Sequence, residues 1–163
     1  MKSTALTLDS YRVVSNHTIA EILENEVTGE KSFHSIVAFK AGDVVHQFSG
    51  GKTMLTPTYL TVQTGERRHI TLNPEFLQYI NHSCNPNVFF NTTTFEVTAL
   101  KDIEPGDELT FFYPSTEWDM VQPFACLCGS KNCLQNIQGA KYLSKEVIQQ
   151  YKITDFIQRM LSK

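Results

Sequence analysis

Four cysteines constrain this chain more than any other feature of its sequence. Three of them, Cys126, Cys128 and Cys133, form a C-x-C-x4-C cluster in the stretch CLCGSKNC, and Cys84 is the only other cysteine. Turn-forming residues inside the cluster allow the loop to fold back and direct three sulfurs at one centre. A structural zinc site commonly has four ligands in a closed tetrahedron. The sequence therefore favours one zinc ion held by all four cysteines.

Two other interpretations of the cysteines remain open. Free cysteines are often buried as small apolar side chains, so four unconnected thiols would also fit the sequence. A disulfide framework is the remaining interpretation, although Cys126 and Cys128 lie too close together for an easy mutual bridge and nothing indicates secretion. The zinc interpretation has a wider consequence, because it would tie the segment around Cys84 to a loop much later in the chain.

Composition describes a soluble globular protein of about one domain. The chain has 163 residues, of which 41% are hydrophobic, so it can bury one sizeable core. It carries 14 Lys+Arg and 17 Asp+Glu, for a net charge of -3. This balance indicates no direct nucleic-acid partner, which would need a basic surface. With no visible signal peptide and no apolar run approaching the ~18 residues of a membrane span, we expect no membrane association and no secretion. The expected location is a cytoplasmic-type reducing compartment, nuclear if the source is a eukaryote.

Short segments rich in β-branched and aromatic residues dominate the first two thirds of the chain. Turn signals such as Ser49-Gly50-Gly51 separate many of them. The pattern predicts strands at residues 35–39, 43–48, 59–63, 67–72, 87–90, 95–100 and 108–113.

Helices are expected at three places. Asn73 as N-cap and Pro74 at the first helical position predict a helix that runs to Ile80 and leads directly into the sequence NHSC. Two more helices are predicted at the end of the chain, at residues 144–150 after a Ser cap and at residues 154–161 after a Thr cap. The predicted fold class is therefore mostly β with a few helices, in one compact unit.

Three sequence blocks, in order, resemble the SET-domain protein methyltransferases. INHSCNPN at residues 80–87 resembles the family block R-F-I-N-H-S-C-x-P-N, and IEPGDELTFFY at residues 103–113 resembles I-x-x-G-E-E-L-T-x-D-Y. CLCGSKNCLQNIQG at residues 126–139 resembles the post-SET block C-x-C-G-S-x-x-C-x-G-x-I-x-G. The resemblance runs from roughly residue 10 to residue 140.

The resemblance implies a fold of small β-sheets with a knot-like arrangement of the NHSC and C-terminal segments. It implies a SET domain at residues 1–113, a post-SET zinc-binding segment at residues 114–140 and a C-terminal helical extension at residues 141–163. No cysteines remain to build the zinc cluster of a pre-SET segment.

The activity that the resemblance implies is transfer of a methyl group from S-adenosylmethionine to the ε-amine of a lysine in a protein or peptide. Tyr113 corresponds to the catalytic tyrosine of the family. The residues expected to contact the cofactor are Asn81, His82, Phe124 and Leu127. The residues expected to line the lysine channel are Phe111 and Phe112.

The chain also departs from the family pattern. The glycine turn near the cofactor, G-x-G-x-x-A, reads EKSFHS at residues 30–35, so Glu30 and Ser32 replace two glycines. Phe112 replaces a common aspartate, and Gln135 replaces a common glycine of the post-SET block. These changes leave two alternatives to an active enzyme: a catalytically weak or inactive SET-like module that binds proteins, and a zinc-stapled domain that never binds the cofactor. The retained Asn81, His82 and Tyr113 favour the enzyme.

Overall fold

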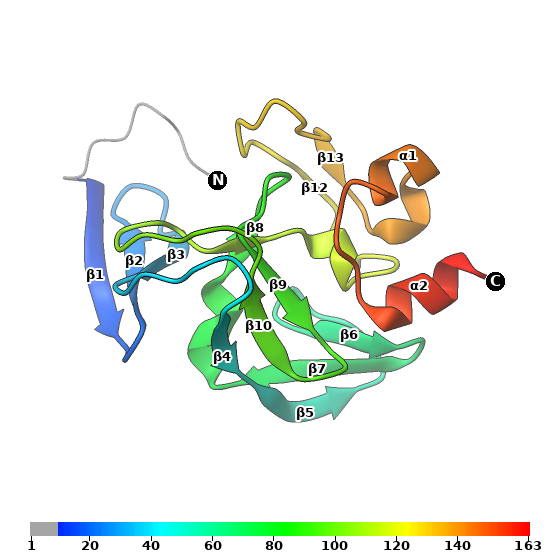
Figure 1. The fold of residues 1–163 in the computed structure, drawn as a ribbon, viewed down its shortest axis with the longest axis horizontal. Helices are drawn as coiled ribbons and strands as arrows, with labels where there is room; N and C mark the ends of the chain where they lie inside the picture. The colour runs from blue at the N-terminus through cyan, green and yellow to red at the C-terminus, as the bar shows by residue number, and fades with distance from the viewer. Residues whose placement is uncertain (1–9) are drawn as a thin grey trace.

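The computed structural model describes residues 10–163, and this part of the chain is built from small β-sheets with two short α-helices (Figure 1). The first sheet has the strand order β1-β2-β3, the second β4-β10-β9 and the third β5-β7-β6. Two further pairs join β11 to β8 and β12 to β13. The strands are β1 (Tyr11–Asn16), β2 (Ala20–Asn25), β3 (Lys31–Ser35), β4 (Val44–Gln47), β5 (Ser49–Met54), β6 (Val62–Gly65), β7 (Arg68–Asn73), β8 (Asn81–His82), β9 (Val88–Asn91), β10 (Glu96–Ala99), β11 (Thr110–Phe111), β12 (Phe124–Ala125) and β13 (Asn136–Ile137).

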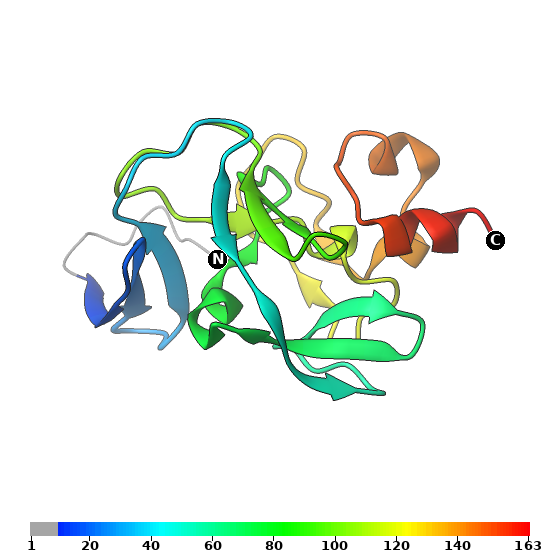
Figure 2. The same cartoon turned by 60° about the horizontal axis from the view of Figure 1, so that its bottom comes forward.

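One apolar core lies between the three larger sheets. Phe33 of β3, Ile70 of β7 and Phe90 of β9 are all within 2% of complete burial and belong to the same cluster of side chains. Figure 2 shows the first sheet at one end of the molecule and the other two packed beside it. Each fully buried side chain of this size contributes roughly 1.5–3 kcal/mol relative to an exposed one, so the sheets are held together mainly by apolar burial.

The short strands β8 and β11 bring two distant segments side by side. They pair in parallel, with Asn81 opposite Thr110 and His82 opposite Phe111. The pairing continues past the strand ends, because the Ser83 amide donates to the Phe111 carbonyl at 3.0 Å. The NHSC sequence is therefore fixed directly beside the chain that carries Tyr113.

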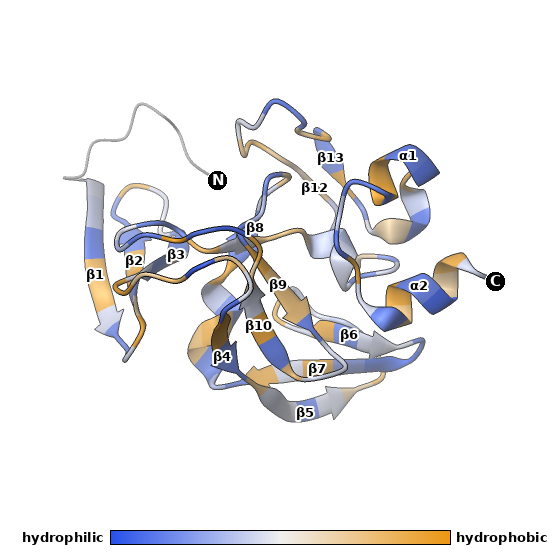
Figure 3. Cartoon of the chain, viewed as in Figure 1, coloured by the Kyte–Doolittle hydropathy of each residue, from blue (hydrophilic) through white to orange (hydrophobic). Residues whose placement is uncertain are grey.

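The C-terminal segment forms a second, smaller apolar cluster. Helices α1 (Lys145–Ile148) and α2 (Asp155–Leu161) begin at Ser144 and Thr154, whose hydroxyls accept from backbone amides in the first turn, as the sequence predicts. Figure 3 shows hydrophobic and hydrophilic residues alternating along α2. Its buried residues Phe156 and Ile157 pack with Ala140, Ile148 and Trp118.

The chain turns into this cluster at Gly139. This residue has φ +119°, and a Cβ on it would lie 2.4 Å from the carbonyl oxygen of Trp118. Both the backbone conformation and the close approach require glycine. No helix in residues 10–163 has the length and apolar character needed to span a membrane.

Three local predictions are wrong, and two more hold only in part: the strand expected at 59–63 begins only at Val62, and that expected at 108–113 is reduced to Thr110–Phe111. The helix expected from Asn73 is a 3-10 helix at Glu75–Tyr79, which starts after Pro74 and has i→i+3 hydrogen bonds. The segment 35–39 contains only the last residue of β3 and an isolated bridge at Phe39, because the chain bends after Ser35, whose hydroxyl donates to the Val37 carbonyl.

The third wrong prediction concerns Ser49-Gly50-Gly51, which begins strand β5 instead of forming a turn. A Cβ on Gly50 would lie 3.2 Å from the Ile70 side chain, and one on Gly51 would lie 2.5 Å from the Thr71 hydroxyl. The two glycines therefore serve close approach of β5 to β7.

Candidate functional site

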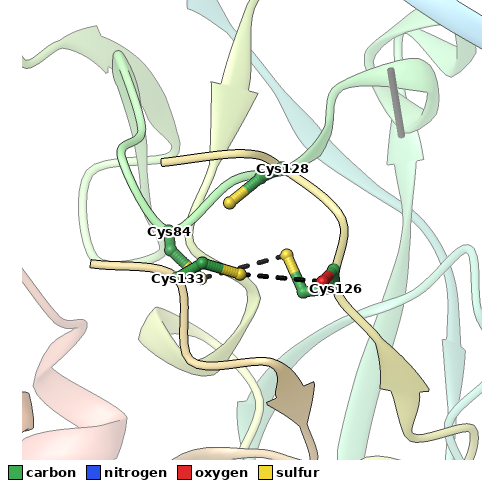
Figure 4. A group of neighbouring side chains, drawn as sticks. All are labelled: Cys84, Cys126, Cys128 and Cys133. Atoms are coloured by element: carbon green, nitrogen blue, oxygen red, sulfur yellow. Dashed lines mark hydrogen bonds between the residues drawn. The ribbon is translucent and has the colours of Figure 1, made fainter. Parts of the chain in front are cut away.

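The four cysteines lie together, although they come from separate parts of the chain (Figure 4). Cys84 follows β8, whereas Cys126, Cys128 and Cys133 belong to the loop between β12 and β13. All four sulfurs lie within 4.8 Å of one another, with Cys84 Sγ and Cys126 Sγ 4.0 Å apart. A tetrahedral zinc site with Zn–S bonds of about 2.3 Å has sulfur–sulfur distances of about 3.8 Å. The arrangement fits such an ion, and none of the four cysteines is in a disulfide.

The protonation of these thiols depends on whether a cation is present. Burial raises the pKa of Cys84 and raises that of Cys126 to about 11. Burial also opposes ionisation of Cys128, but hydrogen bonding with Ser130 outweighs it, and the pKa falls to about 6. A divalent cation among the four sulfurs would favour the thiolate at every position. The donor set and its geometry therefore fit a structural zinc ion.

His82 connects this cluster to Tyr113. The Tyr113 amide donates to His82 Nδ1 at 3.1 Å, so the proton of the neutral ring is on Nε2, which lies 3.4 Å from Cys84 Sγ. Burial lowers the pKa of His82 to about 3, so the ring is neutral near pH 7. Its two contacts fix the position of Tyr113 relative to the cysteine cluster.

A cavity of about 670 Å³ lies beside the NHSC segment. Its lining includes all four residues expected to contact a cofactor: Asn81, His82, Phe124 and Leu127. Lys31 supplies a cation to the same wall, and its carbonyl accepts a hydrogen bond from the Asn81 side chain at 2.8 Å. The structure thus brings together residues from β3, β8 and the loop after β12.

The positions that lack the family glycines do not need left-handed backbone. Among the non-glycine residues of the described chain, positive φ occurs only at Phe95 and Gln135. Glu30, just before β3, and Ser32, within it, therefore have backbone conformations that an L-residue adopts without strain. The Ser32 hydroxyl lies 2.8 Å from His34 Nε2, so this side chain is engaged inside the sheet.

A second cavity, of about 300 Å³, meets the first at Tyr113 and Phe124, which line both. Phe111 and Glu117 also line it, together with apolar side chains such as Leu77. Burial, followed by the nearby charge of Glu117, raises the pKa of Tyr113, so its hydroxyl remains protonated. Tyr113 can therefore act as a hydrogen-bond donor between the two cavities.

Phe112, also expected in the channel, lies elsewhere. Its ring is 2% exposed and stacks on Tyr151 with centroids 3.6 Å apart, and it lines a different cavity near Cys84. Successive residues in an extended chain point to opposite sides. Phe111 faces the cavity beside Tyr113, so its neighbour Phe112 faces away from it.

Sequence reasoning missed Glu117. It follows Tyr113 by one helical turn and places a carboxylate in the wall of the second cavity. The available signal was a lone acid in the otherwise uncharged run FFYPSTEW. That signal says nothing about burial, which depends on residues distant in the sequence.

Residues 15–114 match the SET domain family. The chain is 38% identical to "Methyltransferase flvH" of Aspergillus flavus over 95% of its own length and 88% of that protein. It is also 38% identical to "Histone-lysine N-methyltransferase SETD1B" of Homo sapiens, over 36% of this chain and 3% of that protein. The fold and these matches define a SET-type methyltransferase. The chain belongs to the SET-domain family.

Solved structures share the fold. A crystal structure of KRYPTONITE with mCHG DNA and SAH has a TM-score of 0.51 and 26% identity, over 65% of this chain and 26% of that one. Another KRYPTONITE structure, with mCHH DNA, an H3(1-15) peptide and SAH, has a TM-score of 0.54 and 23% identity. The chain thus spans most of the flvH protein but only a small part of SETD1B and KRYPTONITE.

Proposed function

We propose that this protein transfers a methyl group from S-adenosylmethionine to the ε-amine of a lysine in a protein or peptide. The observation that carries the proposal is the pair of cavities that meet at Tyr113. One is large and mixed in polarity, which suits a cofactor. The other is smaller, and most of its lining residues are apolar, which suits the methylene chain of a lysine. KRYPTONITE structures with SAH, and one with an H3 peptide, support this assignment.

In this proposal the larger cavity holds the cofactor. Asn81 and His82 contact it from β8, and Phe124 and Leu127 cover its adenine from the cysteine loop. The Lys31 ammonium is the cation available for the carboxylate of the cofactor. Bound there, the cofactor would supply an electrophilic methyl carbon on its sulfonium.

The smaller cavity positions the amine. A lysine ammonium, with an ordinary pKa near 10.4, must lose a proton before it can attack, and an apolar site lowers that pKa. Phe111 lines the channel, and the Tyr113 hydroxyl orients the nitrogen toward the methyl carbon. Holding the reacting groups in line supplies much of the acceleration.

Zinc has a structural role in the proposal. Cys84, Cys126, Cys128 and Cys133 hold one ion and fold the loop that closes the cofactor cavity. We accordingly propose a SET domain at residues 1–113, a post-SET segment at 114–140 and a helical extension at 141–163. The proposed setting is a cytoplasmic-type reducing compartment, nuclear if the source is a eukaryote, with a protein substrate, and the net charge of -3 favours no direct nucleic-acid contact.

The test is methyl transfer from radiolabelled S-adenosylmethionine to core histones and, separately, to a whole-cell protein lysate. We expect label in protein, which peptide mass spectrometry then locates on lysine. Label on arginine, or no label in either sample from zinc-loaded protein that binds the cofactor, would contradict the proposal. The second result would favour a protein-binding module.

A further inference from the structure

The smaller cavity contains one carboxylate, that of Glu117. The other titratable side chains that line it are Tyr59 and Tyr113, and the remaining lining residues are apolar or neutral. Glu117 is half-buried and lines this cavity. A formal negative charge therefore lies in the wall of a mainly apolar site.

This carboxylate has hydrogen bonds but no cation. The Gln63 amide and the Thr116 hydroxyl both donate to Oε2, at 3.0 and 2.6 Å. Within residues 10–163, the ion pairs involve other carboxylates, and no lysine, arginine or histidine pairs with Glu117. Buried charges in proteins are normally paired or bound to metal. Burial accordingly raises the pKa of Glu117 to about 7.

Glu117 also lies close to the proposed reaction centre. The amides of Thr116 and Glu117 both donate to the Tyr113 carbonyl, at 3.1 and 3.0 Å, so one helical turn separates Tyr113 from Glu117. Residues four apart on such a turn share a side, and both side chains line the same cavity. Because the Gln63 amide and the Thr116 hydroxyl both donate to Oε2, Oε1 is the carboxylate oxygen left for a cation that enters the channel toward Tyr113.

We propose that Glu117 binds the substrate amine as its ammonium and then accepts one proton from it. This inference rests on the proposed function. The ammonium and the carboxylate become a neutral amine and a carboxylic acid. The amine lone pair then forms the new C–N bond as the C–S bond of the sulfonium breaks, which yields a methylammonium and a thioether. The carboxyl proton leaves to solvent, so each transfer releases one proton.

The first test is binding of n-butylammonium, a mimic of the lysine side chain, without cofactor or turnover. The readout is the NMR shift of the Gln63 amide, which donates to Glu117. For the wild type at pH 8 we expect saturable binding that weakens at pH 6, where Glu117 is mostly protonated. Uncharged n-butanol should show no such pH dependence.

Three variants make the binding test decisive. Glu117→Gln should weaken n-butylammonium binding at least about tenfold, the effect of one charge-assisted hydrogen bond, and leave n-butanol unchanged. Glu117→Asp keeps the charge and should retain most of the affinity. Glu104→Gln removes an exposed carboxylate outside the cavity and should behave as wild type. Undetectable binding to the wild type, or equal affinity for wild type and folded Glu117→Gln, would overturn the proposal.

The second test is the pH dependence of methyl transfer to the substrate found with histones or lysate. Loss of a general base typically costs about 10²-fold or more, so Glu117→Gln should be slowed by that order at pH 7. The rate difference between wild type and Glu117→Gln should become smaller toward pH 10, because there much of the substrate lysine is already deprotonated in solution. A constant loss at every pH would leave Glu117 a merely structural residue. The binding test can fail while methyl transfer succeeds, so the two proposals fail separately.

Discussion

The three sheets and the cysteine loop between β12 and β13 differ in what holds them together. In the sheets, side chains such as Phe33 and Phe90 are completely buried. In the cysteine loop, Leu127 is 55% exposed, and the buried apolar residue that packs with the cysteines, Ile137, lies in β13 and not in the loop. The sheets can therefore fold through apolar burial, whereas the loop depends on what its sulfurs bind.

The two sides of the proposed active site belong to these two different regions. Phe111 and Glu117, on the side of the smaller cavity, lie on a segment attached to the sheet core. Phe124 and Leu127, on the side of the cofactor cavity, lie on or next to the cysteine loop. Cofactor binding should thus depend on zinc more strongly than the substrate cavity does.

Loss of zinc should have the largest effect. Cys84→Ser, or treatment of the wild type with a chelator, should reduce cofactor affinity at least about a hundredfold, because structural zinc contributes on the order of 10 kcal/mol to folding its site. Amide exchange should accelerate in residues 124–137 and stay slow in β7 and β9. Calorimetry and hydrogen exchange check both, and added zinc should reverse the chelator effect. Sheets that exchange as fast as the loop would remove the distinction between the two regions.

A matched pair of truncations sharpens the same comparison. Ile70→Ala, in the sheet core at 2% exposure, should lower the free energy of unfolding by about 2–5 kcal/mol. Leu127→Ala, on the exposed loop, should change it by less than about 0.5 kcal/mol but weaken cofactor binding. Urea denaturation and cofactor titration of both variants separate the two outcomes. A large loss of stability in Leu127→Ala would show that the loop has an apolar core of its own.

Glu117 should make stability depend on pH. Its pKa is raised in the folded protein to about 7, above the unfolded value, so the native state holds the proton more tightly. The stability that this provides is complete below about pH 4.5 and is lost as pH rises through 7, by at most about 3 kcal/mol. The free energy of unfolding of Glu117→Gln minus that of wild type should therefore grow between pH 5 and pH 8. A constant difference would mean that this carboxyl has an ordinary pKa.

The smallest expected effect is at Gln135. This exposed residue has φ +69°, a conformation that costs an L-residue roughly 1–2 kcal/mol. Gln135→Gly should raise the stability of the zinc-loaded protein by about 1 kcal/mol or less. The gain is limited because glycine also increases the conformational entropy of the unfolded chain. Gln138→Gly, where φ is not positive, should lower it. Thermal unfolding of the two variants gives the comparison, and equal shifts would contradict the backbone argument.

The features that the sequence predicts correctly depend on interactions between residues close in the chain or on the number of residues of one type. Ser144 and Thr154 cap helices because a hydroxyl needs only the next turn as its partner. The mostly β fold follows from the strand-like segments and from the resemblance to SET domains. The grouping of Cys84 with the three later cysteines follows from the C-x-C-x4-C spacing, from the one cysteine left over and from the four ligands of a structural zinc site.

The features that the sequence missed depend on contacts between distant segments. Glu117 lines one cavity with residues 57–62 and 120–124 and accepts a hydrogen bond from the distant Gln63 amide, and nothing next to it in the chain indicates this. Gly50 and Gly51 have the sequence of a turn, and only the close approach of β7 explains why glycine is needed there. Phe112 is an exception, because its placement follows from local geometry: neighbouring residues of an extended chain point to opposite sides, so Phe111 and Phe112 cannot both face one channel.

The central claim is that Tyr113 stands between the bound cofactor and the substrate amine. The most direct test is Tyr113→Phe, measured for both methyl-transfer rate and cofactor affinity. The ring keeps its contacts with Phe111, His82 and Phe124, so cofactor affinity and stability should change little. Only the hydroxyl is lost, and kcat should fall about 10²–10³-fold, the cost of removing one preorganised donor. Equal rates for wild type and Tyr113→Phe would contradict the account.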